Sequence, residues 1–60
     1  KFAYRIPYTT EQNRYQTYDG TIKAPNREAA RDEIMKQAQV FFQMNNRFTP
    51  DYQSTEIDIL

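Results

Sequence analysis

The sequence contains no cysteine and no histidine, and only one glycine among its 60 residues. Because thiolate and imidazole are the usual zinc ligands, their absence excludes the common zinc sites as well as disulfides. The single glycine, Gly20, excludes a glycine-rich loop that could cradle the phosphates of a nucleotide. A chain without cysteine also fits a reducing compartment, so we expect a cytoplasmic protein with no metal site and no cofactor.

Long hydrophobic runs and an excess of one charge are also missing. No uninterrupted apolar stretch is longer than Val40–Phe42, whereas a helix needs about 20 apolar residues to cross a bilayer. Eight basic and eight acidic residues cancel, so no long-range field attracts anionic lipid or nucleic acid. We therefore expect no membrane partner, and we rank nucleic acid below protein as a partner.

Catalytic side chains are few. Without cysteine or histidine, the serine, threonine and lysine residues have no evident activating base. Two carboxylates that share a strand face, Glu56 and Asp58, are expected to point outward, where charged residues usually keep a surface hydrated. A domain of this size also has little volume for a pocket. We therefore predict no catalytic residues, no small-molecule substrate and no enzymatic activity.

Alternating apolar residues predict two strands in the first part of the chain. Between Phe2 and Tyr8 every second side chain is apolar or aromatic, as in a half-buried strand. The segment 14–24 alternates in the same way, and we predict one long strand with a bulge at Gly20 in preference to a hairpin. Pro7 has no amide donor, so we expect it at the strand end or with that side turned away from the ladder.

The second part of the chain predicts a helix followed by a strand. Asn26 is a strong N-cap residue, and the apolar spacing after it predicts a helix from Arg27 to about Asn46. We expect Asn45 or Asn46 to end this helix in the left-handed conformation. The segment 55–60 alternates again and predicts a third strand at the end of the chain.

These elements predict one small α+β domain that spans residues 1–60. With a right-handed crossover through the helix, the third strand pairs most simply beside the first. The expected fold is therefore ββαβ, a three-stranded antiparallel sheet of order 2-1-3 with the helix packed on one face. Five tyrosines and four phenylalanines are many for such a short chain, and tyrosine serves both a thin core and a contact surface.

The helix carries more apolar surface than so small a sheet can cover. At about 100° per residue, a central stripe is expected to face the sheet: Ala30, Ile34, Ala38 and Phe41. Other apolar residues lie on the flanks, and four of them form the candidate partner-binding surface: Met35, Val40, Phe42 and Met44. The return segment with Phe48 and Tyr52, a second copy of the chain, or another protein is needed to cover them.

We therefore predict a small protein-interaction module that binds a protein partner, with homodimerisation as one form of that binding. Stand-alone domains of this size often act as accessory or inhibitor proteins, including those encoded by phages and other mobile elements. We expect such a role here on the basis of size.

Two alternatives follow from the same sequence. The outward sheet face is expected to carry cationic and aromatic side chains that resemble a stacking platform for single-stranded nucleic acid: Arg5, Arg14, Tyr15 and Lys23. Glu56 and Asp58 on that face, together with the neutral total charge, predict weak and salt-sensitive binding. The other alternative is a structural domain excised from a larger protein.

Overall fold

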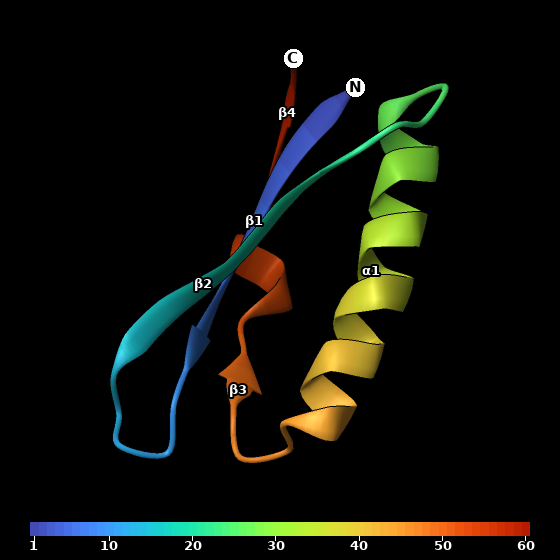
Figure 1. The fold of residues 1–60 in the computed structure, drawn as a ribbon. Coiled ribbons are helices and arrows are strands. Elements are labelled where there is room, and N and C mark those ends of the chain that lie inside the picture. Colours follow the sequence, from blue (N-terminus) through green and yellow to red (C-terminus); the bar gives the residue numbers. More distant parts are fainter.

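The computed structural model describes all residues from Lys1 to Leu60. The elements follow one another in this order: β1 (Phe2–Thr9), β2 (Tyr15–Ile22), α1 (Arg27–Met44), β3 (Thr49–Pro50), the short 3-10 helix η1 (Tyr52–Ser54) and β4 (Glu56–Ile59) (Figure 1). Strand β1 pairs antiparallel with β2 on one side and with β3 and β4 on the other. Helix α1 lies against one face of this sheet. The predicted α+β fold, with the last strand beside the first, is confirmed.

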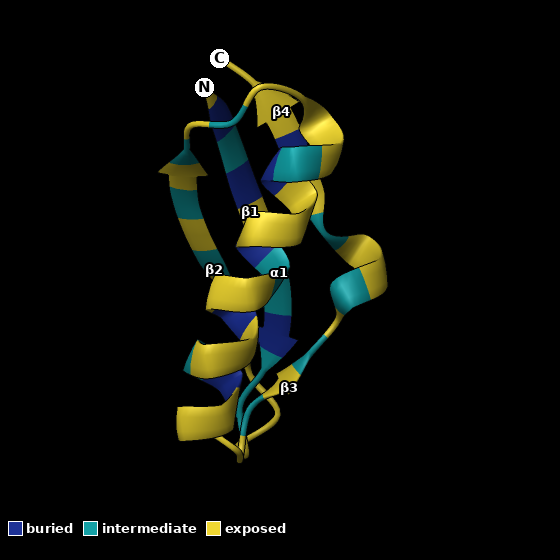
Figure 2. Ribbon diagram, turned by 90° about the vertical axis from the view of Figure 1, so that its right-hand side faces the viewer, coloured by how far each residue is buried: buried dark blue, intermediate teal, exposed yellow.

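The core lies between β1 and α1. Every second side chain of β1 points towards the helix, and α1 returns a stripe with helical spacing. Nine residues are buried: Phe2, Tyr4, Ile6, Tyr8, Ala30, Ile34, Ala38, Phe42 and Ile57. In Figure 2 the buried positions follow β1 and the inner side of α1, while the outward side of α1 is exposed. The core is therefore one layer thick.

Strand β2 is a regular strand without a bulge. Its residues pair one to one with β1, from Tyr15 opposite Thr9 to Ile22 opposite Phe2. The prediction of one long strand is confirmed, but the prediction of a bulge at Gly20 is wrong. Gly20 serves close packing instead, because a Cβ atom there would lie 2.5 Å from the Tyr4 hydroxyl oxygen. The ring of Tyr4 fills the space that a side chain would need.

The turn between β1 and β2 depends on one left-handed residue. The amide of Asn13 donates to the carbonyl of Thr10, and the amide of Thr10 donates to the carbonyl of Arg14, both at 2.9 Å. Asn13 has φ 61° and is the only residue other than glycine with positive φ. Asparagine tolerates this conformation better than most residues, so the turn closes without glycine.

Helix α1 begins as predicted but ends differently. The Asn26 side chain accepts a hydrogen bond from the Ala29 amide at 2.8 Å, which satisfies one of the free amides of the first turn. At the other end Asn45 has φ −119° and ψ 62°, so the expected left-handed residue is absent there. Instead, both the backbone amide and the side-chain amide of Asn45 donate to the carbonyl of Phe41.

The return segment forms an interrupted strand beside β1. Thr49 pairs with Thr9, and Glu56 pairs with Arg5. These two pairs lie four residues apart along β1 but seven residues apart along the return segment. The return segment therefore has three extra residues, and these form η1. The interruption lies beside Pro7, whose carbonyl accepts from the Asp51 amide at 2.9 Å but which has no amide to return the bond. Pro7 thus turns its missing donor away from β2, towards this gap.

Candidate protein-interaction surface

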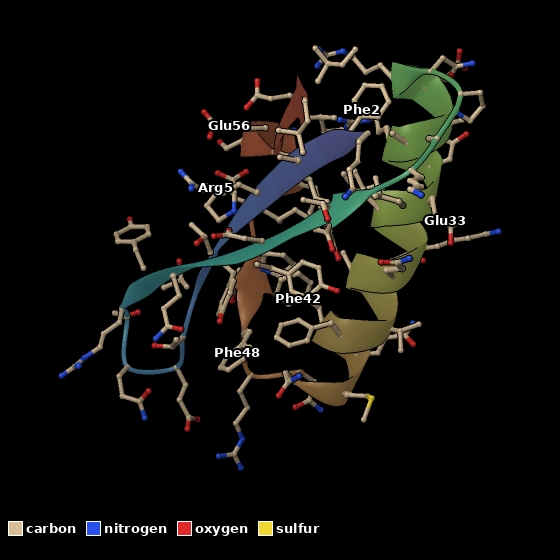
Figure 3. All side chains as sticks on the ribbon, turned by 45° about the horizontal axis from the view of Figure 1, so that its top comes forward. Phe2, Arg5, Glu33, Phe42, Phe48 and Glu56 are labelled. Carbon is tan, nitrogen blue, oxygen red and sulfur yellow. The ribbon has the colours of Figure 1, made fainter.

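Phe42 lies in the core, so it is removed from the candidate partner-binding surface. Its side chain is 6% exposed, and its ring centroid lies 5.4 Å from that of Tyr8 and 6.1 Å from that of Tyr52. The return segment folds back across the sheet edge, and η1 brings Tyr52 onto Phe42. Figure 3 shows Phe42 and Phe48 on the helix side of the sheet. Inclusion of Phe42 in the surface was therefore wrong.

The adjacent Phe41 fixes which flank of α1 faces which edge of the sheet. Its ring packs against Tyr18 of β2, with 4.6 Å between the centroids. Phe42 is about 100° further round the helix and contacts Tyr52 on the opposite side of β1. Moving from Phe42 to Phe41 therefore leads towards β2, and residues beyond Phe41 in that direction lie on the β2 flank of the helix.

The two exposed apolar residues of the helix lie on this β2 flank. Met44 is about 60° beyond Phe41, and Val40 is about 100° beyond it, in the direction away from Phe42. Val40 is 58% exposed and Met44 is 81% exposed. At a spacing of four residues they are neighbours on the helix surface. We call Val40 and Met44 the apolar flank; Met35, on the other side of α1, is half-buried.

A shallow hollow adjoins the apolar flank at the C-terminal end of α1. It has a volume of about 250 Å³ and is lined by residues of the β1–β2 turn and the helix end: Glu11, Met44, Asn45, Asn46, Arg47 and Phe48. Arg47 pairs with Glu11 at 3.3 Å across its rim. The lining of the hollow therefore combines apolar side chains, Met44 and Phe48, with both signs of charge.

The residues proposed for nucleic-acid binding do not converge. Tyr15 begins β2, Arg14 lies in the turn before it, and Lys23 follows the far end of the strand. Eight residues of extended chain span roughly 27 Å, so Tyr15 and Lys23 are at opposite ends of the outward face. The structure therefore spreads these side chains along the sheet.

Arg5, the central cation of the outward face, is surrounded by carboxylates. Its side chain lies 3.6 Å from that of Asp19, and its cross-strand neighbour on the other side is Glu56. Asp58 follows on the same face, opposite Ala3. Figure 3 shows Arg5 and Glu56 together on the side of the sheet away from Phe42. The potential around Arg5 is therefore set by acidic groups, which repel phosphate.

One tyrosine has a shifted pKa, and it belongs to the core. Burial raises the pKa of Tyr4 above its ordinary value of 10.0, and the neighbouring Tyr18 and the charge of Asp19 act in the same direction. The shift keeps the Tyr4 hydroxyl protonated, as its position over Gly20 between sheet and helix requires. It gives Tyr4 no catalytic use near neutral pH.

No three acidic side chains come together in a way that could hold a metal ion. Helix α1, the one long helix, is not apolar enough to span a membrane. The fold and the apolar flank define a small α+β domain with exposed apolar residues at one end of its helix. Comparison with known proteins found no matching family model, no similar curated protein and no similar solved structure.

Proposed function

We propose that this chain is a small, non-enzymatic protein-interaction module that acts by occupying a surface of a protein partner. An accessory or inhibitory role in the cytoplasm fits its size and its lack of cysteine. The partner binds the apolar flank and places a side chain in the hollow beside Met44. The rim pair of Arg47 and Glu11 meets polar groups of the partner.

The observation that carries this proposal is the exposure of Val40 and Met44, because the other large apolar residues of the helix are buried or half-buried. Phe41, Phe42 and Met35 are all at least partly buried. The domain therefore leaves only Val40 and Met44, among the large apolar residues of the helix, exposed to solvent. Burying a large aliphatic side chain is worth about 1.5–3 kcal/mol. Two such residues beside a hollow give a partner a compact anchor point.

Comparative capture from an extract of the cells that encode the chain tests the proposal. The wild-type chain and Met44→Glu are immobilised side by side, and bound proteins are identified by mass spectrometry. Gln39→Glu is the matched control, because Gln39 is also exposed but lies about 100° from Val40 and about 140° from Met44 around the helix. We expect a protein that wild type and Gln39→Glu retain and Met44→Glu loses. Equal capture by all three folded variants contradicts the proposal.

A further inference from the structure

The free edge of β2 presents a complete row of unpaired backbone groups. Hydrogen bonds alternate along an antiparallel pair, and the bond from the Thr10 amide to the Arg14 carbonyl sets their phase. In the one-to-one register, the even-numbered residues of β2 bond to β1. The odd-numbered residues point their amides and carbonyls to the free edge: Tyr15, Thr17, Asp19 and Thr21. None of these groups takes part in the hydrogen bonds made outside the regular elements.

The other edge of the sheet is blocked. It is divided into β3 and β4 by η1, and β4 is only four residues long. The Leu60 amide donates to the Lys1 carbonyl, so by the same alternation the Ile57 carbonyl points outward from β4. The guanidinium of Arg27, at the start of α1, donates to that carbonyl. An added strand would have to displace this contact, so β2 is the one edge open to pairing.

Strand β2 also lacks most of the devices that usually protect an edge. Edge strands are commonly shielded by proline, a bulge, a covering segment or charged side chains, lysine above all. Within Tyr15–Ile22, β2 contains no proline and no lysine, its register has no bulge, and its one charged residue, Asp19, pairs with Arg5. The strand is eight residues long, which is long for an edge strand of so small a domain.

We infer that a second copy of this chain pairs with β2, antiparallel and about a twofold axis at Tyr18. In this register Thr17 lies opposite Asp19 of the second copy, and Tyr15 lies opposite Thr21. Every amide and carbonyl of the free edge then finds a partner. The two Tyr18 side chains form the central pair on the helix side, where side chains of a non-bonded pair approach closely. The two sheets become one continuous sheet.

The charge pattern selects this register. If the second strand is shifted by two residues so that Asp19 faces itself, two carboxylates meet across the axis, which is unfavourable. The opposite shift leaves Thr21 without a partner in β2 of the second copy. A net charge of zero allows the two copies to approach without overall repulsion. Tyr15, which is 86% exposed, gains a cross-strand neighbour.

The apolar flank lies on the same side of the domain as this edge. Phe41 packs on Tyr18, and Met44 extends about 60° further round the helix towards the open side. In the dimer, both helices lie on the same face of the continuous sheet, and the apolar flank of each copy stays accessible. The inference goes beyond the proposed function, since it names an occupant for the edge of the sheet and leaves the hollow beside Met44 for a different protein.

Sedimentation equilibrium over a wide concentration range, up to about 1 mM, tests the inference. We expect a dimer whose dissociation constant changes in opposite directions when a positive or a negative charge is placed at position 17. Thr17→Lys places an ammonium opposite each Asp19, so this lysine pairs with a carboxylate of the second copy instead of shielding the edge. It tightens the dimer roughly threefold or more, whereas Thr17→Asp weakens it by a similar factor. Thr49→Lys and Thr49→Asp, at an exposed position of β3, are the charge-matched controls and leave association unchanged.

Thr17→Pro removes an amide that faces the free edge and leaves the bonds between β1 and β2 intact. It weakens the dimer roughly tenfold or more, and a circular dichroism spectrum checks that the variant is folded. A wild-type chain that stays monomeric overturns the inference, as does a dimer that ignores the Thr17 charge variants. A monomer that still captures a protein through Met44 overturns this inference while supporting the proposed function.

Discussion

Position 20 requires glycine because the Tyr4 ring packs closely against it, and not because of its backbone conformation. No glycine in the chain has positive φ, so the position does not need glycine for its backbone angles. A Cβ atom would come within 2.7 Å of the Tyr4 ring carbon Cζ, and the ring would have to shift. Aromatic side chains that cover a cross-strand glycine in this way also hold the strand register.

Substitution of Gly20 by alanine is therefore expected to destabilise the fold. Displacing the Tyr4 ring from a well-packed core costs about 1–3 kcal/mol in the free energy of unfolding, measured by urea denaturation. Thr21→Ala, at the adjacent exposed position, serves as the control and changes stability much less. In a Tyr4→Val background the Gly20→Ala penalty should shrink, because the clashing atoms are gone. A penalty of the same size in both backgrounds contradicts the assignment.

Tyr4 also makes the fold sensitive to alkaline pH. Because its pKa is raised on folding, the folded state favours the protonated hydroxyl. The resulting stability is fully present below the unfolded-state value of about 10 and is lost as the pH rises through the higher folded-state value. Denaturation at about pH 8 and pH 11 should show a smaller alkaline loss in Tyr4→Phe than in wild type. Tyr15→Phe, which changes an exposed tyrosine, should lose as much stability as wild type.

At the scale of elements, the N-cap of α1 allows the contribution of one side chain to the stability of the fold to be measured. Asn26→Ala removes the acceptor of the Ala29 amide and is expected to lower the free energy of unfolding by about 1 kcal/mol. The control is Asn46→Ala, at an exposed position beyond the helix, which should change stability by only a few tenths of that amount. Urea denaturation of both variants makes the comparison, and equal losses would show that the cap is not responsible.

The elements also divide into those that local sequence determines and those that it does not. The strand from Phe2, the cap at Asn26 and the alternation around Ile57 each carry a period or a stop signal within a few residues. The return segment has no such period. Its path depends on a gap beside Pro7, which is more than 40 residues earlier in the chain, and on three residues looped out as η1.

The candidate surface, like the fold, could be predicted only in part from the sequence. Helical periodicity identifies Val40 and Met44 as residues that the sheet cannot cover, and both are exposed. The burial of Phe42 was also open to prediction, because Phe42 continues the spacing of four that links Ala30, Ile34 and Ala38; Tyr52 from the return segment adds to its cover. The open edge of β2 required the strand register, which becomes known only when β1 and β2 are paired.

At the scale of the whole molecule, charge placement disfavours the binding of nucleic acid to the outward sheet face. The domain is elongated, with extents of 37 × 18 × 16 Å, and its outward sheet face is open. A cation on such a face binds phosphate only where its field is not cancelled. Asp19 and Glu56 flank Arg5 on both sides, so the most central cation is neutralised on the face that would have to bind.

Fluorescence anisotropy with a labelled single-stranded oligonucleotide at about 50 mM salt, where phosphate contacts are strongest, measures the consequence. We expect no saturable binding by the wild-type chain. The double variant Asp19→Lys, Glu56→Lys turns the surroundings of Arg5 basic and should bind weakly, with affinity that falls steeply as salt is added. Its binding shows that the assay would detect such a site. Saturable binding by wild type that Arg5→Ala abolishes would instead place nucleic acid on the outward face, because only a direct contact with Arg5 could overcome the adjacent carboxylates.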